Sequence, residues 1–391
     1  MDDFRRVRMG MVGGGEGAFI GPVHRAAAEL DGAVELVCGA FSSDPERSRR
    51  SGRTLYRLPP ERCYDSWQAL LATEAKLPAA ERMQFLTVAT PNHLHAEIAR
   101  AAMAAGFHVL CDKPLATDLA EAESLQAEAG RRAALGHPVL VGVTYNYTGY
   151  PMVREARELI ASGALGSIRR VQCEYLQGWL AHPLPGNKQA DWRTDPGRAG
   201  AAGCFGDIGS HCENLVSFTT GLEIESLCAD LSTFVPGRRL DDDGSVLLRF
   251  RGGARGTIQA SQVALGEENS LSLRVYGDCG ALAWSQQEPN SLLVRYADRP
   301  YEVRRTGGAG LGGAGVQAAR LPAGHPEGFL EAFANVYRGF GRAVAACEAG
   351  AAEAAAAAVD YPTLADGVRG MRFIDAVVRS STAGGRWVSL P

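Results

Sequence analysis

The sequence lacks any long hydrophobic run. A membrane-spanning helix needs about 20 consecutive apolar residues, whereas the alanine-rich stretch 351–359 is short and carries Glu353. The first residues, from Met1 to Arg6, also lack the apolar core of a signal peptide. We therefore expect neither a membrane protein nor a secreted one.

Paired cysteines are missing as well. The nine cysteines lie far apart, their number is odd, and no two of them form a C-x-x-C pair. This pattern disfavours a disulfide framework and a thiolate zinc site, and it fits a reducing cytoplasm. We expect a cytoplasmic protein without a bound metal.

A concentrated positive face is also absent. The net charge is −4, and the 40 Lys and Arg residues are scattered along the chain. Proteins that bind nucleic acid backbones need their basic residues gathered on one face. The expected partner is therefore a small molecule, and neither a nucleic acid nor a membrane.

What is present fits two globular domains. A chain of 391 residues, 46% of them hydrophobic, exceeds the size of one ordinary hydrophobic core. Up to residue 145, short apolar runs alternate with helical patterns, which is typical of a doubly wound parallel sheet. The strands are expected at 7–12, 35–40, 85–89, 108–111 and 139–143, and the helices at 23–30, 96–105 and 118–134.

The pattern changes after Pro151. One helix, 152–161, is followed by strand-like runs joined by glycine turns, which predict an α+β domain with a mostly antiparallel open sheet. The runs are 168–176, 225–234, 245–251, 254–263, 270–276, 281–285 and 291–296. We place the dinucleotide-binding domain at 1–145 and the substrate-binding and oligomerisation domain at 146–391, leaving room for the C-terminal segment to pack back on the first domain.

Two stretches are predicted to be loops, 180–200 and 307–324. The second is dominated by glycine and alanine. It is interpreted either as a mobile lid or subunit-spanning arm, or as a disordered surface insertion.

A glycine cluster at the end of the first predicted strand suggests nucleotide binding. Gly13 and Gly15 allow a tight turn and a close approach of the backbone to a pyrophosphate at a helix N-terminus. An ordinary glycine turn is the alternative, but strand, turn and helix occur in the required order. The residues expected to contact the coenzyme here are Gly13, Gly15, Gly17, Ala18, Phe19 and Ile20.

The end of the second predicted strand leaves the coenzyme open between NAD and NADP. Ser42 and Ser43, with Arg47 nearby, would suit the 2′-phosphate of NADP. Asp44 would instead suit the ribose diol of NAD, or it caps the helix that starts at Pro45.

Polar residues follow two further predicted strands, where parallel sheets bind their ligands. Thr90, Pro91, Asn92 and His95 come after the third strand; His93 and His95 are otherwise simple loop or capping histidines. Asp112, Lys113 and Pro114 come after the fourth strand, and Lys113 is placed to project into a cleft.

The last motif is Gly206-Asp207-Ile208-Gly209-Ser210-His211. A helix starting near Asp207 would put Asp207 and His211 on one face, giving a carboxylate beside an imidazole base. The alternative is that Asp207 caps the helix and His211 is a half-buried side chain.

Together these motifs resemble the glucose–fructose oxidoreductase / inositol dehydrogenase family, often written Gfo/Idh/MocA. The resemblance rests on Gly13-x-Gly15, residues 90–95, Asp112-Lys113-Pro114 and 206–211, in order along the chain. The segments around Asp366-Gly367 and Ser380 to Gly385 are similar to the family's closing helix and strand. Two features depart from the family: Ala18 occupies the place of a third glycine, and Asp112 replaces a glutamate.

The resemblance implies a Rossmann domain, a second domain whose open sheet often forms the interface of a homodimer or homotetramer, and NAD or NADP as coenzyme. It also implies that Lys113, Asp207 and His211 act on a hydroxyl carbon of a sugar, inositol or aminocyclitol glycoside. His211 would take the hydroxyl proton, Lys113 would stabilise the alkoxide, and Asp207 would hold substrate and orient His211. Further candidates for the substrate pocket are Tyr145, Tyr147, Trp192, Arg193 and His325.

Two other functions fit the same residues. Some relatives oxidise transiently, eliminate a glycosidic bond and reduce again. The second alternative is a regulator that binds the coenzyme without catalysis. The presence of the complete set Lys113, Asp207 and His211 argues against this alternative. A short-chain dehydrogenase is disfavoured because no Tyr-x-x-x-Lys follows the fourth strand, and a zinc alcohol dehydrogenase lacks its Cys/His cluster.

Overall fold

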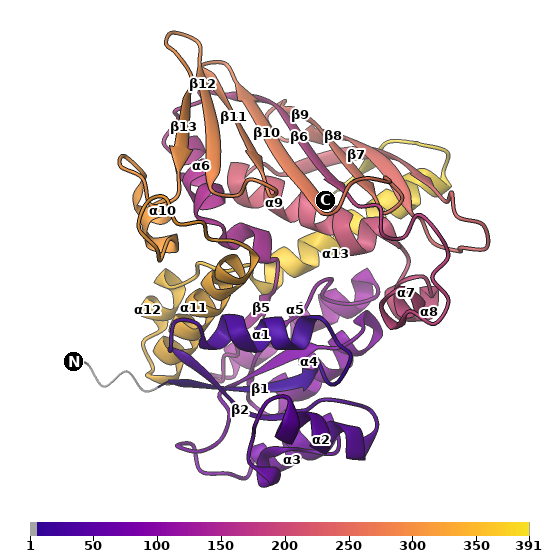
Figure 1. Cartoon of the computed structure of the whole chain (residues 1–391), viewed down its shortest axis with the longest axis vertical. Coiled ribbons are helices and arrows are strands. Elements are labelled where there is room, and N and C mark those ends of the chain that lie inside the picture. Colours follow the sequence, from indigo (N-terminus) through magenta and orange to yellow (C-terminus); the bar gives the residue numbers. More distant parts are fainter. Residues whose placement is uncertain (1–5, 391) are drawn as a thin grey trace. The chain divides into compact units, whose positions relative to one another are not determined.

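The computed structural model describes residues 6–390 and divides the chain into two compact units. The first unit is built from the described residues up to Ala116, Ala120–Thr144 and Phe333–Val368. The second is built from Thr117–Leu119, Tyr145–Ala332 and the described residues from Arg369 onward. A C-terminal segment therefore completes the unit that the N-terminal residues begin (Figure 1).

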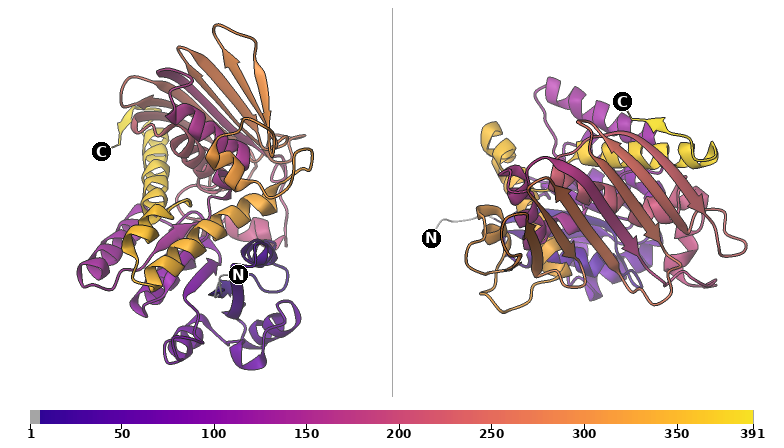
Figure 2. Two further views of the ribbon diagram at one scale, coloured as in Figure 1. Left: turned by 90° about the vertical axis from the view of Figure 1, so that its left-hand side faces the viewer. Right: turned by 90° about the horizontal axis from the view of Figure 1, so that it is seen from above.

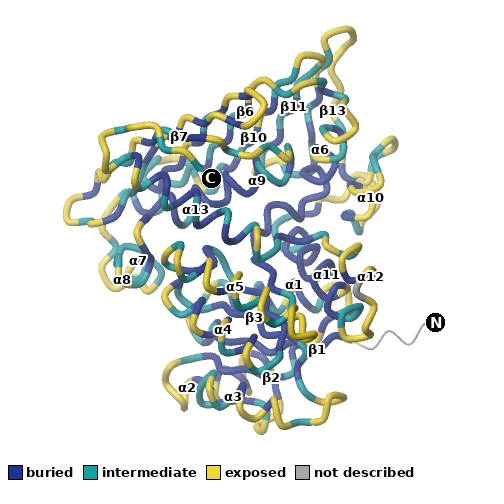
Figure 3. Tube along the Cα trace, turned by 180° about the vertical axis from the view of Figure 1, so that it is seen from behind, coloured by how far each residue is buried: buried dark blue, intermediate teal, exposed yellow. Residues whose placement is uncertain are grey.

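Five parallel strands form the sheet of the first unit, in the order β2-β1-β3-β4-β5. They are β1 (Val7–Gly13), β2 (Val34–Ala40), β3 (Phe85–Ala89), β4 (His108–Cys111) and β5 (Val141–Val143). Every residue of β3 and β4 is buried, as expected for parallel strands covered on both faces. The central strands are accordingly dark blue in Figure 3. The predicted doubly wound parallel sheet is confirmed.

Helices cover this sheet on both sides. They are α1 (Ile20–Glu29), α2 (Pro45–Thr54), α3 (Trp67–Glu74), α4 (His95–Ala104), α5 (Leu119–Ala134), α11 (Phe329–Glu348) and α12 (Ala352–Ala357). Helices α1 and α11 share one face: the ring of His24 lies 5.0 Å from that of Phe333, and Phe340 packs edge-on against Phe85 of β3 at 5.2 Å. Helices α2 and α3 lie on the other side of the sheet (Figure 1).

The sheet of the second unit has nine strands in the order β13-β12-β11-β10-β6-β9-β8-β7-β14. Only β6 and β9 pair in parallel among these described strands, so the predicted mostly antiparallel sheet is confirmed. The strands are β6 (Ile168–Leu176), β7 (Ile224–Ser232), β8 (Asp243–Phe250), β9 (Arg255–Ser261), β10 (Ser270–Gly277), β11 (Gly280–Ser285), β12 (Ser291–Tyr296), β13 (Glu302–Arg305) and β14 (Val388–Ser389).

One face of the nine-stranded sheet is buried. Along β8, Val246, Leu248 and Phe250 are buried, while the residues between them are exposed. Helices α6 (Pro151–Ala161), α9 (Ser210–Thr220) and the later turns of α13 (Leu364–Thr382) pack on the buried face. Figure 2, right, shows the strands side by side from the opposite side.

Three local predictions are corrected. The stretch 180–200 contains two short helices, α7 (Lys188–Arg193) and α8 (Pro196–Ala199), each capped by a side chain, Asn187 or Asp195. The glycine-rich stretch 307–324 contains α10 (Gly313–Ala318). The closing strand is Val388–Ser389, because 380–382 still belong to α13 and 383–385 form the turn after it.

Helix α10 shows why these elements were missed. Its glycine and alanine residues have no helical periodicity, but buried Glu155 of α6 accepts a hydrogen bond from Gly312 N at 2.8 Å. Glu158 of the same helix accepts hydrogen bonds from Gly313 N and Ala314 N. The carboxylates satisfy the free N–H groups at the start of α10, so tertiary contacts stabilise a helix of low local propensity.

Short 3-10 turns occur at Pro60–Arg62, Asn92–Leu94 and Asn146–Gly149. No helix within residues 6–390 combines the length and hydropathy that crossing a bilayer requires.

An ion pair ties the returning segment to the sheet of the first unit. His108 Nε2 of buried β4 lies 3.4 Å from Glu348 Oε1 at the end of α11. Burial by itself would lower the pKa of His108, but the Cys347 thiol and the Glu348 carboxylate raise it. The hydrogen bond from His108 lowers the pKa of Glu348.

We expect Glu348→Gln to lower the free energy of unfolding most between about pH 4.5 and 6.5, the ordinary pKa values of the two groups. The contribution of Glu348 is lost as the pH falls through its depressed pKa, and that of His108 is lost as the pH rises through its raised pKa. Urea unfolding at a series of pH values measures this. Exposed Glu353→Gln is the control, and a Glu348→Gln deficit that is equal at all pH values would contradict the assignment.

Candidate functional site

The turn after β1 accepts only glycine at two positions. Gly13 has a φ of 91°, and a Cβ there would lie 2.2 Å from Ala89 O. A Cβ at Gly15 would lie 2.3 Å from Phe41 O. The turn therefore packs directly against the backbone that follows β2 and β3, which leaves no room for side chains.

The turn leads to a helix N-terminus that is open for a ligand. Helix α1 begins at Ile20, and no side chain of the described residues caps it at Phe19. The side chain of Phe19 is 66% exposed, and no atom lies within 4 Å of the Cβ position at Gly17. Free N–H groups at the positive end of a helix suit a pyrophosphate. The predicted residues 13, 15 and 17–20 thus lie along one continuous segment, from the last residue of β1 to the first residue of α1, and this segment fits a dinucleotide.

The residues after β2 are arranged by helix capping. Asp44 accepts a hydrogen bond from Arg47 N at 2.7 Å, so it is the N-cap of α2. Ser42 Oγ accepts hydrogen bonds from Asp44 N and from Arg47 Nε, at 3.1 and 3.0 Å. Ser43 is exposed beside them. Asp44 therefore caps helix α2, which is one of the two roles expected for it. Capping uses only one carboxylate oxygen, so the other oxygen can still accept a hydrogen bond from a ribose hydroxyl.

The loops after β3 and β4 are joined by His95. Its ring nitrogens lie 2.8 Å from Thr90 O and 2.7 Å from Pro114 O. The side chain of His95 is almost fully buried, and its two hydrogen bonds connect the two loops.

Thr90 Oγ1 is buried and has no hydrogen-bond partner among residues 6–390. An unsatisfied buried hydroxyl beside the glycine turn fits a missing polar ligand. Pro91 and buried Asn92 lie in the same loop.

Asp112 is a carboxylate surrounded by donors. The Thr144 hydroxyl donates a hydrogen bond to Oδ1, and His24 Nε2 lies 3.7 Å from Oδ2. Burial alone would raise the pKa of Asp112, but His24, Thr144 and His95 hold it well below its usual range. Lys113 follows directly, and the Lys113–Pro114 peptide is cis.

In the second unit, Asp207 and His211 stand on a helix that starts with a π-helical turn, Phe205–Gly209. Ser210 N donates to Phe205 O, five residues back. Asp207 is therefore inside the helix rather than its N-cap, and its angle to His211 differs from that of a regular α-helix. Such π turns occur often at functional sites. A Cβ at Gly209 would lie 2.6 Å from the Phe205 ring, so the glycine is required there.

Asp241, in the connection between β7 and β8, fixes the start of this helix. Its carboxylate accepts hydrogen bonds from Gly203 N at 2.6 Å and Phe205 N at 2.8 Å. Burial raises the pKa of Asp241 in spite of these bonds. The carboxylate takes the role that a capping side chain would otherwise play.

Three tyrosine rings surround His211. Its ring centroid lies 4.8 Å from that of Tyr147, 5.6 Å from Tyr145 and 6.0 Å from Tyr175. His211 is 6% exposed. Burial raises the pKa of Tyr147 and of Tyr175, so both phenols remain hydrogen-bond donors at neutral pH. A buried imidazole in an aromatic cage is held in one orientation, as a general base requires.

Neutral polar groups extend this cage. Tyr147 and Tyr175 share a hydrogen bond of 2.5 Å, and Tyr175 donates to Asn269 at 2.6 Å. Gln177 donates to the same Asn269 oxygen at 2.7 Å and accepts from Trp179 at 3.0 Å. The chain of hydrogen bonds contains no charged group, which suits the recognition of hydroxyl groups.

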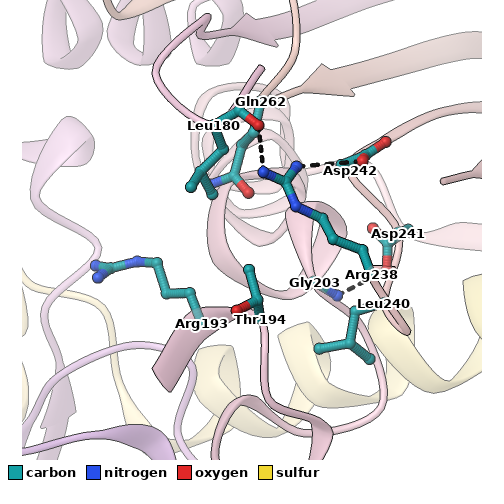
Figure 4. A pocket seen from close by; sticks show the side chains of 9 residues that line it. All are labelled: Leu180, Arg193, Thr194, Gly203, Arg238, Leu240, Asp241, Asp242 and Gln262. Carbon is teal, nitrogen blue, oxygen red and sulfur yellow. Dashed lines mark hydrogen bonds and ion pairs between the residues drawn. The ribbon is translucent and has the colours of Figure 1, made fainter. Parts of the chain in front are cut away.

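Asp207 is held by two donors. Arg193 Nε and Gln262 Nε2 both bind Oδ2, at 3.1 and 2.9 Å. The Arg193 guanidinium also lies 4.2 Å from the centroid of the Trp192 ring. Arg193 and Gln262 belong to the wall of a small hollow, which Figure 4 shows together with Arg238 and Asp242.

The second unit thus brings together Tyr145, Tyr147 and His211 in one cluster and Trp192, Arg193 and Asp207 in another. His325 joins neither cluster by any contact found in the described residues; it is exposed and its Nδ1 lies 3.1 Å from Pro322 O of its own loop. Its role in the pocket stays a prediction. Among residues 6–390 no three His, Cys, Asp or Glu side chains form a group that would hold a metal.

Several polar residues of these clusters were not predicted. In the first unit, His24 lies in the predicted helix 23–30 but was not among the predicted site residues. Tyr175, Gln262 and Asn269 stand on or next to strands, where nothing in their local pattern indicates a ligand site. They are identified only by the partners they meet.

Two family models match the chain. The model described as an oxidoreductase family with an NAD-binding Rossmann fold matches residues 7–138. The model of the GFO/IDH/MocA C-terminal domain matches residues 153–283. The first model covers β1 to β4, and the second covers β6 to β10 and most of β11.

Relatives match over nearly the whole length. The uncharacterized oxidoreductase YfiI of Bacillus subtilis (strain 168) is 34% identical over 387 residues, 98% of this chain and 96% of that protein. Levoglucosan dehydrogenase of Pseudarthrobacter phenanthrenivorans is 28% identical over 424 residues, 99% of each chain.

A solved structure has the same fold. It is that of an inositol dehydrogenase homologue from Azotobacter vinelandii in complex with NADH and myo-inositol. Its sequence is 36% identical, the TM-score is 0.92, and the match covers 99% of this chain and 98% of that one. The predicted resemblance is confirmed, and the chain belongs to the GFO/IDH/MocA family of oxidoreductases with an NAD-binding Rossmann domain.

Proposed function

We propose that this oxidoreductase is an NAD-dependent dehydrogenase of a secondary hydroxyl group in a neutral sugar or cyclitol. The observation that carries the proposal is the position of His211, buried among three tyrosines on the helix that also presents Asp207. An imidazole held in this way suits the abstraction of a hydroxyl proton near neutral pH.

The coenzyme would be held by residues of the first unit. The glycine turn and the N-terminus of α1 suit the pyrophosphate, and Thr90 Oγ1 offers an unsatisfied polar atom. Ser42, Ser43 and Arg47 stand at the end of β2, where the adenosine ribose is expected. Bound NAD supplies the hydride acceptor.

Each catalytic residue has a separate role in the proposal. His211 accepts the proton of the reacting hydroxyl, and Lys113 binds the same oxygen and stabilises the developing alkoxide. Asp207, fixed by Arg193 and Gln262, accepts a hydrogen bond from a neighbouring substrate hydroxyl. Lys113 and His211 belong to different compact units. The proposal that both act on one hydroxyl group is tested by the rate of hydride transfer in variants of each residue.

Two observations support a neutral substrate. The cations that line the hollow are paired within their own unit, Arg193 with Asp207 and Arg238 with Asp242. The tyrosines that surround His211 hydrogen-bond to each other, and the chain of hydrogen bonds continues to asparagine and glutamine side chains. Buried neutral donors and acceptors recognise hydroxyl groups and strongly reject analogues that lack them. One relative is named for levoglucosan, and another was solved in complex with myo-inositol. Both compounds are neutral rings that carry several hydroxyl groups.

The compartment and assembly are also proposed. All nine cysteines are free thiols, which fits a reducing cytoplasm.

The face of the nine-stranded sheet that lies opposite α6 and α9 carries a mixture of side chains such as Ser245, Leu247 and Arg249. This face would form the interface of a homodimer or homotetramer. Sedimentation analysis tests the assembly; a monomer at micromolar concentration would contradict it.

We expect Lys113→Ala and His211→Ala each to slow hydride transfer by about 10²- to 10⁴-fold, because each removes a group that acts on the reacting oxygen. Single-turnover absorbance of NADH measures this step directly. Exposed His137→Ala is the control and should match wild type. If both variants stayed within about threefold of wild type, the roles given to Lys113 and His211 would be wrong.

The substrate class is tested by a panel of sugars, inositols and their phosphorylated or carboxylated analogues, with NAD and NADP in parallel. We expect NADH to accumulate in proportion to product with neutral polyols. Deoxy analogues should lose at least about tenfold in kcat/KM, because they leave a buried polar group unpaired. Product without NADH would favour oxidation followed by elimination, and a preference for anionic analogues would contradict the neutral class.

Gly15→Ala tests the coenzyme site. The added methyl group would meet Phe41 O at 2.3 Å, so the turn has to shift away from the position that the pyrophosphate needs. We expect the Kd for NADH, measured by calorimetry, to rise at least about tenfold. Gly130→Ala in α5 is the matched control, because nothing lies within 4 Å of its Cβ position. Equal Kd values for the two variants would argue against coenzyme binding at the glycine turn.

A further inference from the structure

A buried polar chain lies beneath the Lys113 loop in the first unit. His24 of α1 is fully buried. Its Nδ1 lies 2.7 Å from the hydroxyl oxygen of Tyr337 in α11, and that oxygen lies 3.2 Å from Thr87 Oγ1 of β3. At the other side of the ring, Nε2 lies 3.7 Å from Asp112 Oδ2. The chain thus links Thr87, Tyr337, His24 and Asp112.

The hydrogens of this chain have one arrangement that satisfies each group with a neutral imidazole. Asp112 accepts only, so Nε2 of His24 carries the proton and faces it. Nδ1 then accepts from the Tyr337 hydroxyl, and that hydroxyl oxygen accepts from Thr87. Burial raises the pKa of Tyr337, so the phenol remains a donor. The donors therefore all run toward the Asp112 carboxylate, which Thr144 approaches from the other side.

If His24 only filled space in the core, an apolar side chain could take its place. His24 Nε2 is buried and has no hydrogen-bond partner in the part of the chain that the structure describes, and the carboxylate of Asp112 lies 3.7 Å from it, within ion-pair distance. Burying an N–H without a partner is unfavourable, whereas an apolar side chain would fill the same space without that cost. The neighbouring carboxylate is the group that makes an imidazole favourable here.

We propose that His24 is a positioning residue of the coenzyme and Lys113 site: it holds the Asp112 carboxylate ionised and in one orientation next to Lys113, while Tyr337 and Thr87 select the His24 tautomer. The link to Lys113 rests on the proposed function. Asp112 and Lys113 are consecutive, so protonating or turning the carboxylate changes the electrostatic environment of the lysine and the backbone that carries it.

The charged and titratable groups around Asp112 come from several elements. His24 faces it from α1 and His95 from α4, and both favour the ionised carboxylate. Tyr337 of α11 and Cys111 of β4 are close enough for the carboxylate to raise their pKa values. Lys113 is adjacent in sequence. Among these groups, His24 is the one whose ring both approaches the carboxylate and is itself oriented by another buried side chain.

A matched pair of variants separates this role from packing. The side-chain nitrogen of glutamine reaches the position of Nε2, whereas that of asparagine reaches only the position of Nδ1. His24→Gln should therefore keep a donor toward Asp112, and His24→Asn should keep only the contact with Tyr337. Both variants remove the same imidazole, so their comparison isolates Asp112.

The first measurement is urea unfolding of the coenzyme-free protein between about pH 2 and 7, because the pKa of Asp112 lies below its usual range. Without the donor, the pKa of Asp112 rises, and protonation at low pH then relieves the cost of the buried charge. We expect His24→Gln to be more stable than His24→Asn at neutral pH and this advantage to shrink as the pH falls. An advantage that is constant with pH, or a more stable His24→Asn, would overturn the proposal whether or not the protein is a dehydrogenase.

The second measurement is kcat/KM against pH with the best substrate of the panel. The acid limb reports His211 and should stay in place, whereas on the plateau above it kcat/KM of His24→Asn should be at least about tenfold lower than that of His24→Gln. Superimposable profiles, together with a pH-dependent stability difference, would show that His24 holds Asp112 without serving the site, and would overturn the positioning role.

If His24→Asn does not fold, Tyr337→Phe carries the test. This change removes the hydroxyl that sets the tautomer and leaves the volume nearly unchanged. The same loss of kcat/KM on the plateau relative to wild type is expected, and an unchanged profile would count against the proposal.

Discussion

The loops of the nucleotide-binding unit are held in place by buried side chains that hydrogen-bond to backbone. His95 ties the loop after β3 to the loop after β4 through Thr90 O and Pro114 O. The glycine turn, in contact with Ala89 O and Phe41 O, is fixed to the same set of loops. A ligand site at the carboxyl edge of a parallel sheet is made of such loops, so its geometry depends on groups that never touch the ligand.

The second unit uses the same device with a carboxylate. Asp241 accepts hydrogen bonds from the backbone at the start of the π-helical turn, and the helix then presents Asp207 and His211. Asp207 is further fixed by Arg193 and Gln262. In both units, one buried polar side chain satisfies backbone groups that would otherwise be unpaired and thereby sets the direction of the functional side chains.

The two proposed halves of the chemistry differ in their electrostatics. Asp112 in the first unit is a carboxylate kept ionised by two histidines and a hydroxyl group. The tyrosines around His211 in the second unit hydrogen-bond to neutral groups, Asn269 and Gln177, while the Asp207 carboxylate adds to burial in raising the pKa of Tyr147. A charged environment suits control of an amine such as Lys113, and a neutral one suits recognition of hydroxyl groups.

The sequence by itself determined the two sheets, the glycine turn, the position of Lys113 at the end of β4 and the helix of His211. These features follow from short-range patterns: the alternation of apolar residues, the conformational freedom of Gly13 and Gly15, and the order of strand, turn and helix. Tertiary structure alone decided the partners, because His24 meets Tyr337 across 313 residues and Gln262 meets Asp207 across 55. It also decided the π-helical turn and helix α10, whose stability comes from Asp241, Glu155 and Glu158 and not from their own residues. A hydrogen bond between distant segments depends on how the elements pack, and no local pattern in either segment records it.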